Sequence, residues 1–288
     1  MSMDHFIGFL LLALELTVLF LGISLLISLL KGFIPFEKLE RFLSGRNPVI
    51  GVLAAILLAF VTPFCSCSTI PVIVNLLQQK VRFGIVMVFL FASPVLDPTI
   101  ITLMAVLLGP KVAFFYTITT AILAGVIGIT LEKLGFEKYV KNVVMTGYEK
   151  KEKRFSLKDS LKETLALMKT VYPYILIGAG IGSIIKGLVP TEFIVTYFGG
   201  EAWWLVPIAA VVGIPLYIRL STMIPISQIL IVKGMALAPV MALMISSAGA
   251  SLPEIALLNS IFQKKLVIAF IGSVITLATF SGLLFYMI

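Results

Sequence analysis

Long apolar runs alternate with short polar breaks along most of this chain. The first run, residues 6–30, contains one acidic residue, Glu15, and further apolar runs begin near residues 48, 82, 112, 160, 205, 234 and 266. A helix needs roughly 20 mostly apolar residues to cross a bilayer. The pattern therefore predicts an all-α polytopic membrane protein.

Four of these runs are interrupted by polar segments, each of which contains proline. The breaks span residues 62–68, 93–98, 213–222 and 248–254. A break leaves backbone N–H and C=O groups without partners, and lipid cannot satisfy them. We therefore expect discontinuous helices that meet inside the protein at mid-membrane, where transporters place their binding sites.

The breaks recur in the same order in two halves of the chain. Pro71 precedes Pro98 by 27 residues, and Pro225 precedes Pro253 by 28 residues. We interpret the chain as two pseudo-symmetric four-helix halves joined by a loop. The predicted boundaries are 1–134 for the first membrane repeat, 135–159 for the loop and 160–288 for the second repeat.

Composition and charge support the membrane assignment and orient the chain. Hydrophobic residues make up 60% of the sequence and charged residues 12%, against about 25% charged in soluble domains. Basic residues gather between Lys133 and Lys162, and such loops are cytoplasmic. Eight full crossings would then place both termini in the cytoplasm with the halves parallel, although re-entrant pairs are an open alternative. No nucleic-acid-binding module accompanies the charge.

The two cysteines form the most distinctive local feature. Cys65 and Cys67 flank one serine inside the first break. Thiolates are soft ligands that bind soft metals and metalloids, so the pair is a candidate substrate contact. The alternative is that both are small buried apolar residues. Two thiols are too few for a structural zinc site, and the only histidine is His5.

Three ionisable residues lie in apolar surroundings and are candidates for function. Asp97 lies in the second break, where it could bind substrate or carry protons, or cap the helix that starts at Pro98. Glu15 is a second candidate for proton coupling. Arg219, in the third break, could attract an anion or pair with Asp97, or serve only as an interfacial charge.

Hydroxyl side chains accompany the breaks, and no catalytic motif does. Most of the hydroxyls would cap helix ends, but they are also candidate substrate contacts: Ser68, Thr69, Ser93, Ser221 and Thr222. There is no phosphate-binding loop of the P-loop type. We expect a transporter rather than an enzyme, with no metal and no cofactor.

The segment Thr62-Pro-Phe-Cys-Ser-Cys-Ser-Thr-Ile-Pro71 resembles the ArsP-like permease family, also called YraQ-type predicted permeases. Ser93-Pro-Val-Leu-Asp-Pro98 and Ser251-Leu-Pro253 are similar to the same family, and the resemblance covers nearly the whole chain. Characterised members export trivalent organoarsenicals such as methylarsenite. The resemblance implies ion-coupled efflux across the cell membrane, with Cys65 and Cys67 near the route of a thiophilic substrate.

These observations predict a secondary efflux permease in the cell membrane. Its expected partners are the lipid bilayer, a small soft metalloid or other thiophilic solute, and protons. The alternatives are transport of a reduced sulfur compound or a metal complex, and a membrane thiol–disulfide oxidoreductase. Oligomeric state, direction of transport and coupling ion do not follow from the sequence.

Overall fold

The computed structural model describes residues 14, 18, 48–61, 66–141, 203–216, 220–232 and 234–287. Within them every regular element is a helix, as predicted. Before the basic loop the helices are α3 (Pro48–Val61), α4 (Ser66–Gln78), α5 (Phe83–Ala92), α6 (Pro98–Leu107), α7 (Pro110–Lys133) and the 3-10 turn η1 (Phe136–Tyr139). Apart from residues 14 and 18, the predicted first helix lies outside the described residues, as does the segment 142–202 with the predicted fifth helix.

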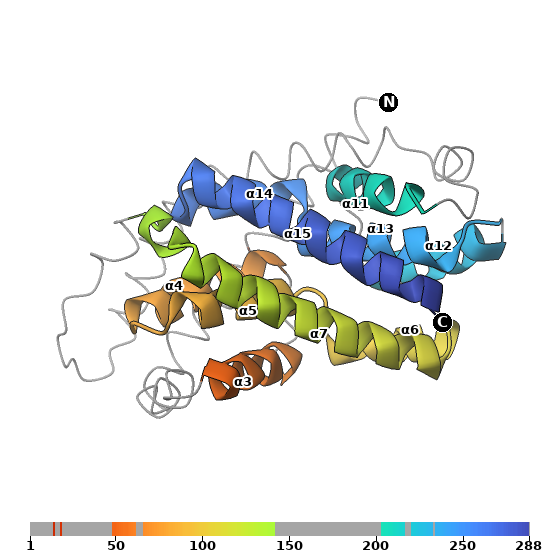
Figure 1. The fold of residues 1–288 in the computed structure, drawn as a ribbon, viewed down its shortest axis with the longest axis horizontal. Helices are drawn as coiled ribbons and strands as arrows, with labels where there is room; N and C mark the ends of the chain where they lie inside the picture. Colours follow the sequence, from red (N-terminus) through yellow and green to blue (C-terminus); the bar gives the residue numbers. More distant parts are fainter. Residues whose placement is uncertain are drawn as a thin grey trace.

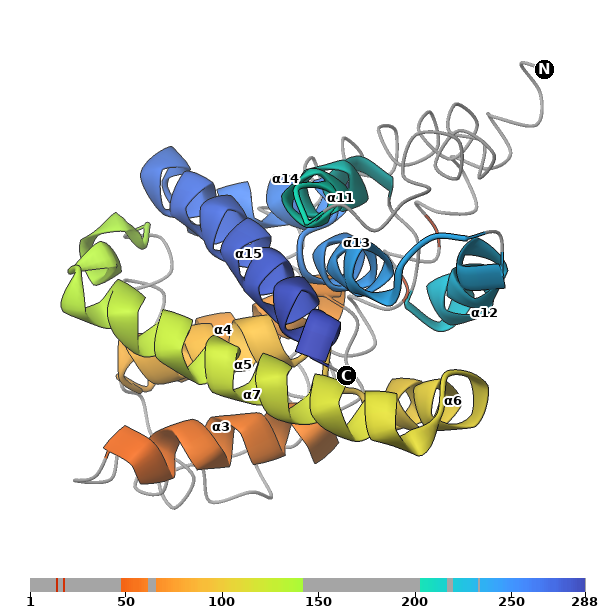
Figure 2. The same ribbon diagram turned by 45° about the vertical axis from the view of Figure 1, so that its right-hand side comes forward.

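The second half has a similar series of helices. They are α11 (Leu205–Leu216), α12 (Leu220–Val232), α13 (Leu237–Gly249), α14 (Leu252–Ile261), α15 (Lys264–Leu284) and the 3-10 turn η2 (Phe285–Met287). Figures 1 and 2 show α7 and α15 crossing the centre of the molecule, with α3 on the outer side of α7 and α11 on the outer side of α15.

Two of the described helices are long and apolar enough to cross a membrane. They are the segments Pro110–Lys133 and Lys264–Met287, each of 24 residues. A third candidate is the pair α13 and α14, which is bent by 44° at its break. The other apolar helices are shorter, and large apolar side chains on α3 and α7 are exposed, as expected for surfaces that contact lipid: Leu53, Leu57, Phe114, Ile122 and Val126.

Helices α5 and α6 together run antiparallel to α7 along its length. At one end, Arg82 precedes α5 and donates to Glu132 near the end of α7, with the Nη2 and Oε1 atoms 3.0 Å apart. At the other end, α6 is joined to the start of α7 by Leu108 and Gly109. The break between α5 and α6 therefore lies beside the middle of α7.

Helices α7 and α15 run in opposite directions. Near the start of α7, the rings of Phe115 and Phe285 pack edge to face with centroids 5.1 Å apart. Near its end, Gln263, just before α15, donates its N–H to the carbonyl of Tyr139 at 2.9 Å. Parallel halves would make these two helices parallel, so that expectation is wrong.

The third break lies within the predicted range 213–222 but is shorter, because α11 ends at Leu216 and α12 begins at Leu220. Helix α11 continues through Gly213 and Pro215 and ends at Leu216. Gly213 packs closely against α13: a Cβ atom at this position would lie 2.7 Å from the Leu243 carbonyl oxygen and 3.2 Å from the Ser247 nitrogen. The glycine therefore serves helix packing rather than a helix break.

Gly128 of α7 lies directly against the backbone of α5. A Cβ atom here would lie 2.8 Å from the Gly84 carbonyl oxygen and 2.9 Å from the Val88 nitrogen on α5. We expect Gly128→Ala to push α5 away from α7 and to destabilise the protein by about 1–3 kcal/mol. The midpoint of thermal unfolding in detergent measures this loss.

Gly272 on α15 provides the matched control. Beyond its own helix, no atom of the described residues lies within 4 Å of a Cβ built at this position, and alanine favours a helix over glycine by up to about 1 kcal/mol. Gly272→Ala should therefore leave the midpoint unchanged or raise it slightly. Equal midpoints for the Gly128→Ala variant and the unmodified protein would contradict the packing argument.

Candidate functional site

The cysteine segment lies at the start of α4. Cys67 and Ser68 are the second and third residues of this helix, whose backbone begins at Ser66. Thr69, one residue further, is fully buried. Cys65 lies outside the described residues, as do the side chains of Cys67 and Ser68. The sequence predicted that the helix resumes near Ser68, and it resumes two residues earlier.

Helix α14, from the other half, packs against α4. It begins with a capping box, in which Ser251 Oγ accepts from the N–H of Glu254 and the Glu254 carboxylate accepts from the N–H of Ser251, both at 3.4 Å. The Glu254 side chain is fully buried. A buried carboxylate therefore lies in the first turn of α14, directly after the fourth break, in a helix that packs against α4. Sequence analysis did not include Glu254 among the candidate site residues.

Asp97 caps α6, as one of its two interpretations predicted. Its Oδ1 accepts from the N–H of Thr99 at 2.7 Å, and Pro98 occupies the first helical position. The carboxylate is partly exposed rather than fully buried. This contact does not test the proton-coupling role of Asp97, which stays a prediction.

Two buried polar side chains, one in the turn itself and one from α7, lie at the connection between α5 and α6. The Ser93 N–H continues the helical pattern to Phe89, while its Oγ is buried without a hydrogen-bond partner among the described residues. Tyr116 of α7 is fully buried and donates its hydroxyl to the Val95 carbonyl at 3.0 Å. Sequence analysis missed Tyr116, although a tyrosine in an apolar helix commonly signals such a bond.

Further predicted site residues lie at the start of α12 or just before it. Ser221 and Thr222 belong to its first turn by backbone, with side chains outside the described residues, and Arg219 lies outside altogether. Further along α12, the Gln228 amide donates to the carbonyl of Leu107 at the end of α6. This bond ties the second half to the first.

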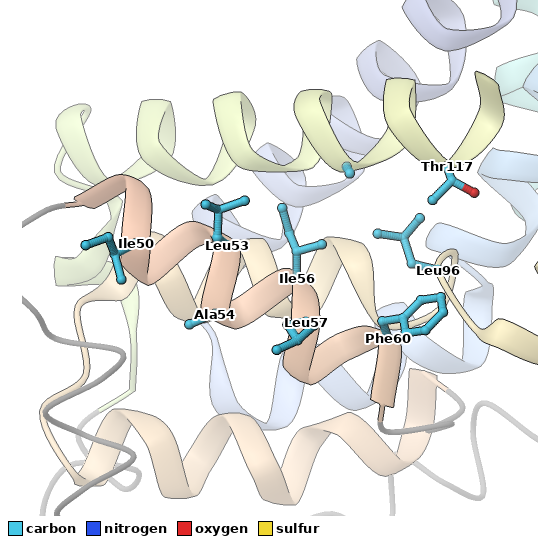
Figure 3. A pocket seen from close by; sticks show the side chains of 9 residues that line it. Ile50, Leu53, Ala54, Ile56, Leu57, Phe60, Leu96 and Thr117 are labelled. Carbon is cyan, nitrogen blue, oxygen red and sulfur yellow. The ribbon is translucent and has the colours of Figure 1, made fainter. Parts of the chain in front are cut away.

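A groove of about 460 Å³ lies between α3 and α7, and Leu96 of the α5–α6 turn lines one end of it. Figure 3 shows the α3 side chains along it, with Leu96 and Thr117 at the far end. Thr117 is the only hydroxyl-bearing residue in a wall that is otherwise aliphatic and aromatic: Ile50, Leu53, Ala54, Ile56, Leu57, Phe60, Leu96 and Ala121. Such a wall suits a lipid chain better than a polar solute, so the groove is not the candidate site.

The candidate site is therefore the set of helix ends at the four breaks. It combines the cysteine segment of α4, the Ser93–Asp97 turn, the start of α12 and the capped start of α14. Helix N-termini supply partial positive charge and broken C-termini supply carbonyl oxygens. Packing joins α4 to α14 and α12 to α6, and solute binding by these helix ends stays a prediction.

Comparisons with known proteins identify the family of the chain. The profile of the ArsP_1 family, described as "Predicted permease", matches residues 3–287. UPF0718 protein MJ0584 of Methanocaldococcus jannaschii is 23% identical over 91% of this chain and 87% of its own length. UPF0718 protein YraQ of Escherichia coli K12 is 27% identical over 83% of this chain and 68% of its own length.

No solved structure matches the chain significantly. The family match nevertheless covers nearly every residue, and the described helices have the lengths and apolar surfaces of a multi-pass membrane protein. The chain therefore belongs to the predicted permease family, and this membership supports a role as a membrane transporter.

Proposed function

We propose that this permease exports a small thiophilic solute, most simply a trivalent organoarsenical, across the cell membrane. The observation that carries the proposal is the position of Cys67 in the first turn of α4, a helix that packs against the capped helix α14. Cys65 precedes this turn by one residue in the sequence. A thiol pair at a helix break next to polar helix ends is suited to transient binding of a soft atom.

The binding step requires no oxidant or reductant. When methylarsenite binds a thiol, an As–S bond forms, one arsenic hydroxyl leaves and the thiol proton goes with it as water. Two thiols can replace two hydroxyls in this way, and water reverses both steps to release the solute. Hydroxyls at the breaks would contact the remaining polar atoms: Ser68, Thr69, Ser93, Ser221 and Thr222.

Efflux against a gradient needs coupling, and we propose protons as the coupling ion. Asp97 and Glu15 are the candidate carriers. Asp97 is partly exposed in the turn that connects α5 to α6. Arg219, in the break before α12, is the proposed contact for a negatively charged group of the solute or for Asp97.

A transport assay tests the thiol mechanism. In inverted membrane vesicles supplied with methylarsenite, we expect the Cys65→Ser/Cys67→Ser double variant to lose at least about tenfold in transport rate, because a hydroxyl does not replace a thiolate as a soft ligand. Ser66→Ala changes the same turn without removing sulfur and should retain transport. Full transport by the double variant would exclude the thiol mechanism.

The same vesicles separate the alternatives. Competition by reduced sulfur compounds or metal complexes, with no accumulation of methylarsenite, would assign a different solute to the permease. A mixed disulfide trapped between Cys65 or Cys67 and a thioredoxin-like partner would favour the oxidoreductase. Either result would replace the organoarsenical proposal.

Asp97 variants distinguish capping from coupling. Asparagine can accept the Thr99 N–H as aspartate does, whereas alanine cannot, so we expect Asp97→Ala to lower stability by about 0.5–2 kcal/mol and Asp97→Asn to leave it nearly unchanged. Because Asn cannot titrate, Asp97→Asn should also abolish the dependence of export on a pH gradient. Wild-type export by Asp97→Asn at every imposed gradient would restrict Asp97 to capping.

A further inference from the structure

The last helices of the two halves correspond at a constant separation in the sequence. Helices α6 and α14 have ten residues each and begin at residues 98 and 252; α7 and α15 begin at residues 110 and 264. The separation is 154 positions in both cases. The N-cap residues, Asp97 and Ser251, follow the same shift. Equal lengths and equal spacing indicate that these segments are structural counterparts.

Helix packing repeats at the same shift. Gly128 of α7 lies against the backbone of Gly84 in α5, and its counterpart Gly282 of α15 lies against the backbone of Ala238 in α13. A Cβ atom would lie 2.8 Å from the Gly84 oxygen in the first case and 2.9 Å from the Ala238 oxygen in the second. The contacts between the halves are also reciprocal. Helix α4 of the first half packs on α14 of the second, and α12 of the second half packs on α6 of the first.

The turn after α4 has its counterpart after α12. Lys80 and Gly234 both adopt the left-handed conformation, with φ of 60° and 96°. The next N–H in each turn bonds back into its helix, from Val81 to the Leu76 carbonyl at 3.1 Å and from Met235 to the Leu230 carbonyl at 3.0 Å. This is the Schellman type of helix end, and all paired residues again differ by 154 positions.

Helix α3 begins, and helix α4 ends, beside the C-terminal half of α7. Early in α3, a Cβ on Gly125 would lie 3.1 Å from Val52, whereas late in α3, Phe60 shares a groove with Leu96 and Thr117 beside the middle of α7. Helix α4 then returns to the start of α5, where Arg82 pairs with Glu132. Thus α3 approaches mid-molecule and α4 leaves in the opposite direction.

The α11–α12 pair behaves in the same way at the other end of the molecule. Early in α11, Val206 lies against Gly282 near the end of α15, and late in α11, Gly213 lies against Ser247 near the break after α13. Helix α12 then returns to the start of α13. In Figure 1, α3 and α4 accordingly lie toward the lower left and α11 and α12 toward the upper right.

We propose that the two halves are inverted repeats, in which α3–α4 and α11–α12 are re-entrant hairpins that enter the membrane from opposite faces. The antiparallel α7 and α15 require an inverted relation, because these counterpart helices would be parallel in parallel repeats. Each face of the membrane then has one hairpin that reaches the broken helix ends. Inverted repeats of this kind permit alternating access, in which the two halves exchange conformations around a fixed site.

Charge assigns the two faces. Most of the described basic residues lie at the membrane face that holds the C-terminal end of α7, whereas Lys111 lies at the other face. The basic set comprises Lys80, Arg82, Lys133, Lys138, Lys141, Lys264 and Lys265. Because basic residues accumulate on the cytoplasmic side, α3–α4 enters from the cytoplasm and α11–α12 from outside. The C-terminus then lies outside the cytoplasm, opposite to the expectation from eight full crossings.

Single cysteines at counterpart positions test this topology. In a Cys65→Ala/Cys67→Ala background we would introduce, one at a time, Val49→Cys, Gln78→Cys and Lys133→Cys, and their counterparts Trp203→Cys, Val232→Cys and Met287→Cys. Each variant is treated with a membrane-impermeant maleimide in intact cells and in inverted vesicles. We expect the first three to be labelled only in vesicles and the last three only in intact cells.

Eight full crossings with parallel halves predict a different result. Residues 78, 133, 232 and 287 would then share the cytoplasmic face, and residues 49 and 203 would lie on the other, which would overturn the proposal. Labelling after detergent addition verifies that each thiol reacts. Alkaline phosphatase fused after Ile288 provides an independent reporter: the inverted topology predicts an active enzyme, and an inactive one would contradict it. None of these measurements depends on the transported solute.

Discussion

Every break in a membrane helix exposes backbone groups that lipid cannot satisfy, and the described residues show how the second and fourth breaks supply partners for them. Asp97 accepts an N–H at the start of α6, and Ser251 and Glu254 cap α14. Tyr116 donates to a carbonyl in the first-half turn, and Gln228 donates to the end of α6. These polar contacts make discontinuous helices tolerable, and they also gather the polar groups that a transported solute could meet.

Small residues allow the helices around these breaks to pack closely. Between helices in a membrane there is no hydrophobic driving force of the kind that acts in water, so close backbone contact carries much of the association. Gly128 and Gly282 bring α7 and α15 against α5 and α13. The resulting packing holds the ends of the short helices in the interior, while the large apolar side chains of α3 and α7 face outward.

Family membership and structure address different parts of the function. The family establishes a permease, and the helix ends supply a physical reason why solute would pass between the halves. The relatives carry names that specify no substrate, so the solute must be argued from chemistry. In this chain the distinctive chemistry is the cysteine pair beside α4, and its soft sulfur atoms separate the proposed substrate from ordinary polar solutes.

The sequence by itself determined the helical class, the membrane location and the neighbourhood of the breaks, because the bilayer imposes a local rule: long apolar runs become helices, and proline with polar residues interrupts them. It also offered helix capping as one of two interpretations of Asp97, from the position of this residue before Pro98. It could not identify the bond from Tyr116 to Val95, or the packing that keeps Gly213 within a helix, since both depend on residues distant in the chain. Only the tertiary structure decided the direction in which each short helix runs, because an apolar helix of 10–14 residues has the same composition whether it continues across the membrane or turns back.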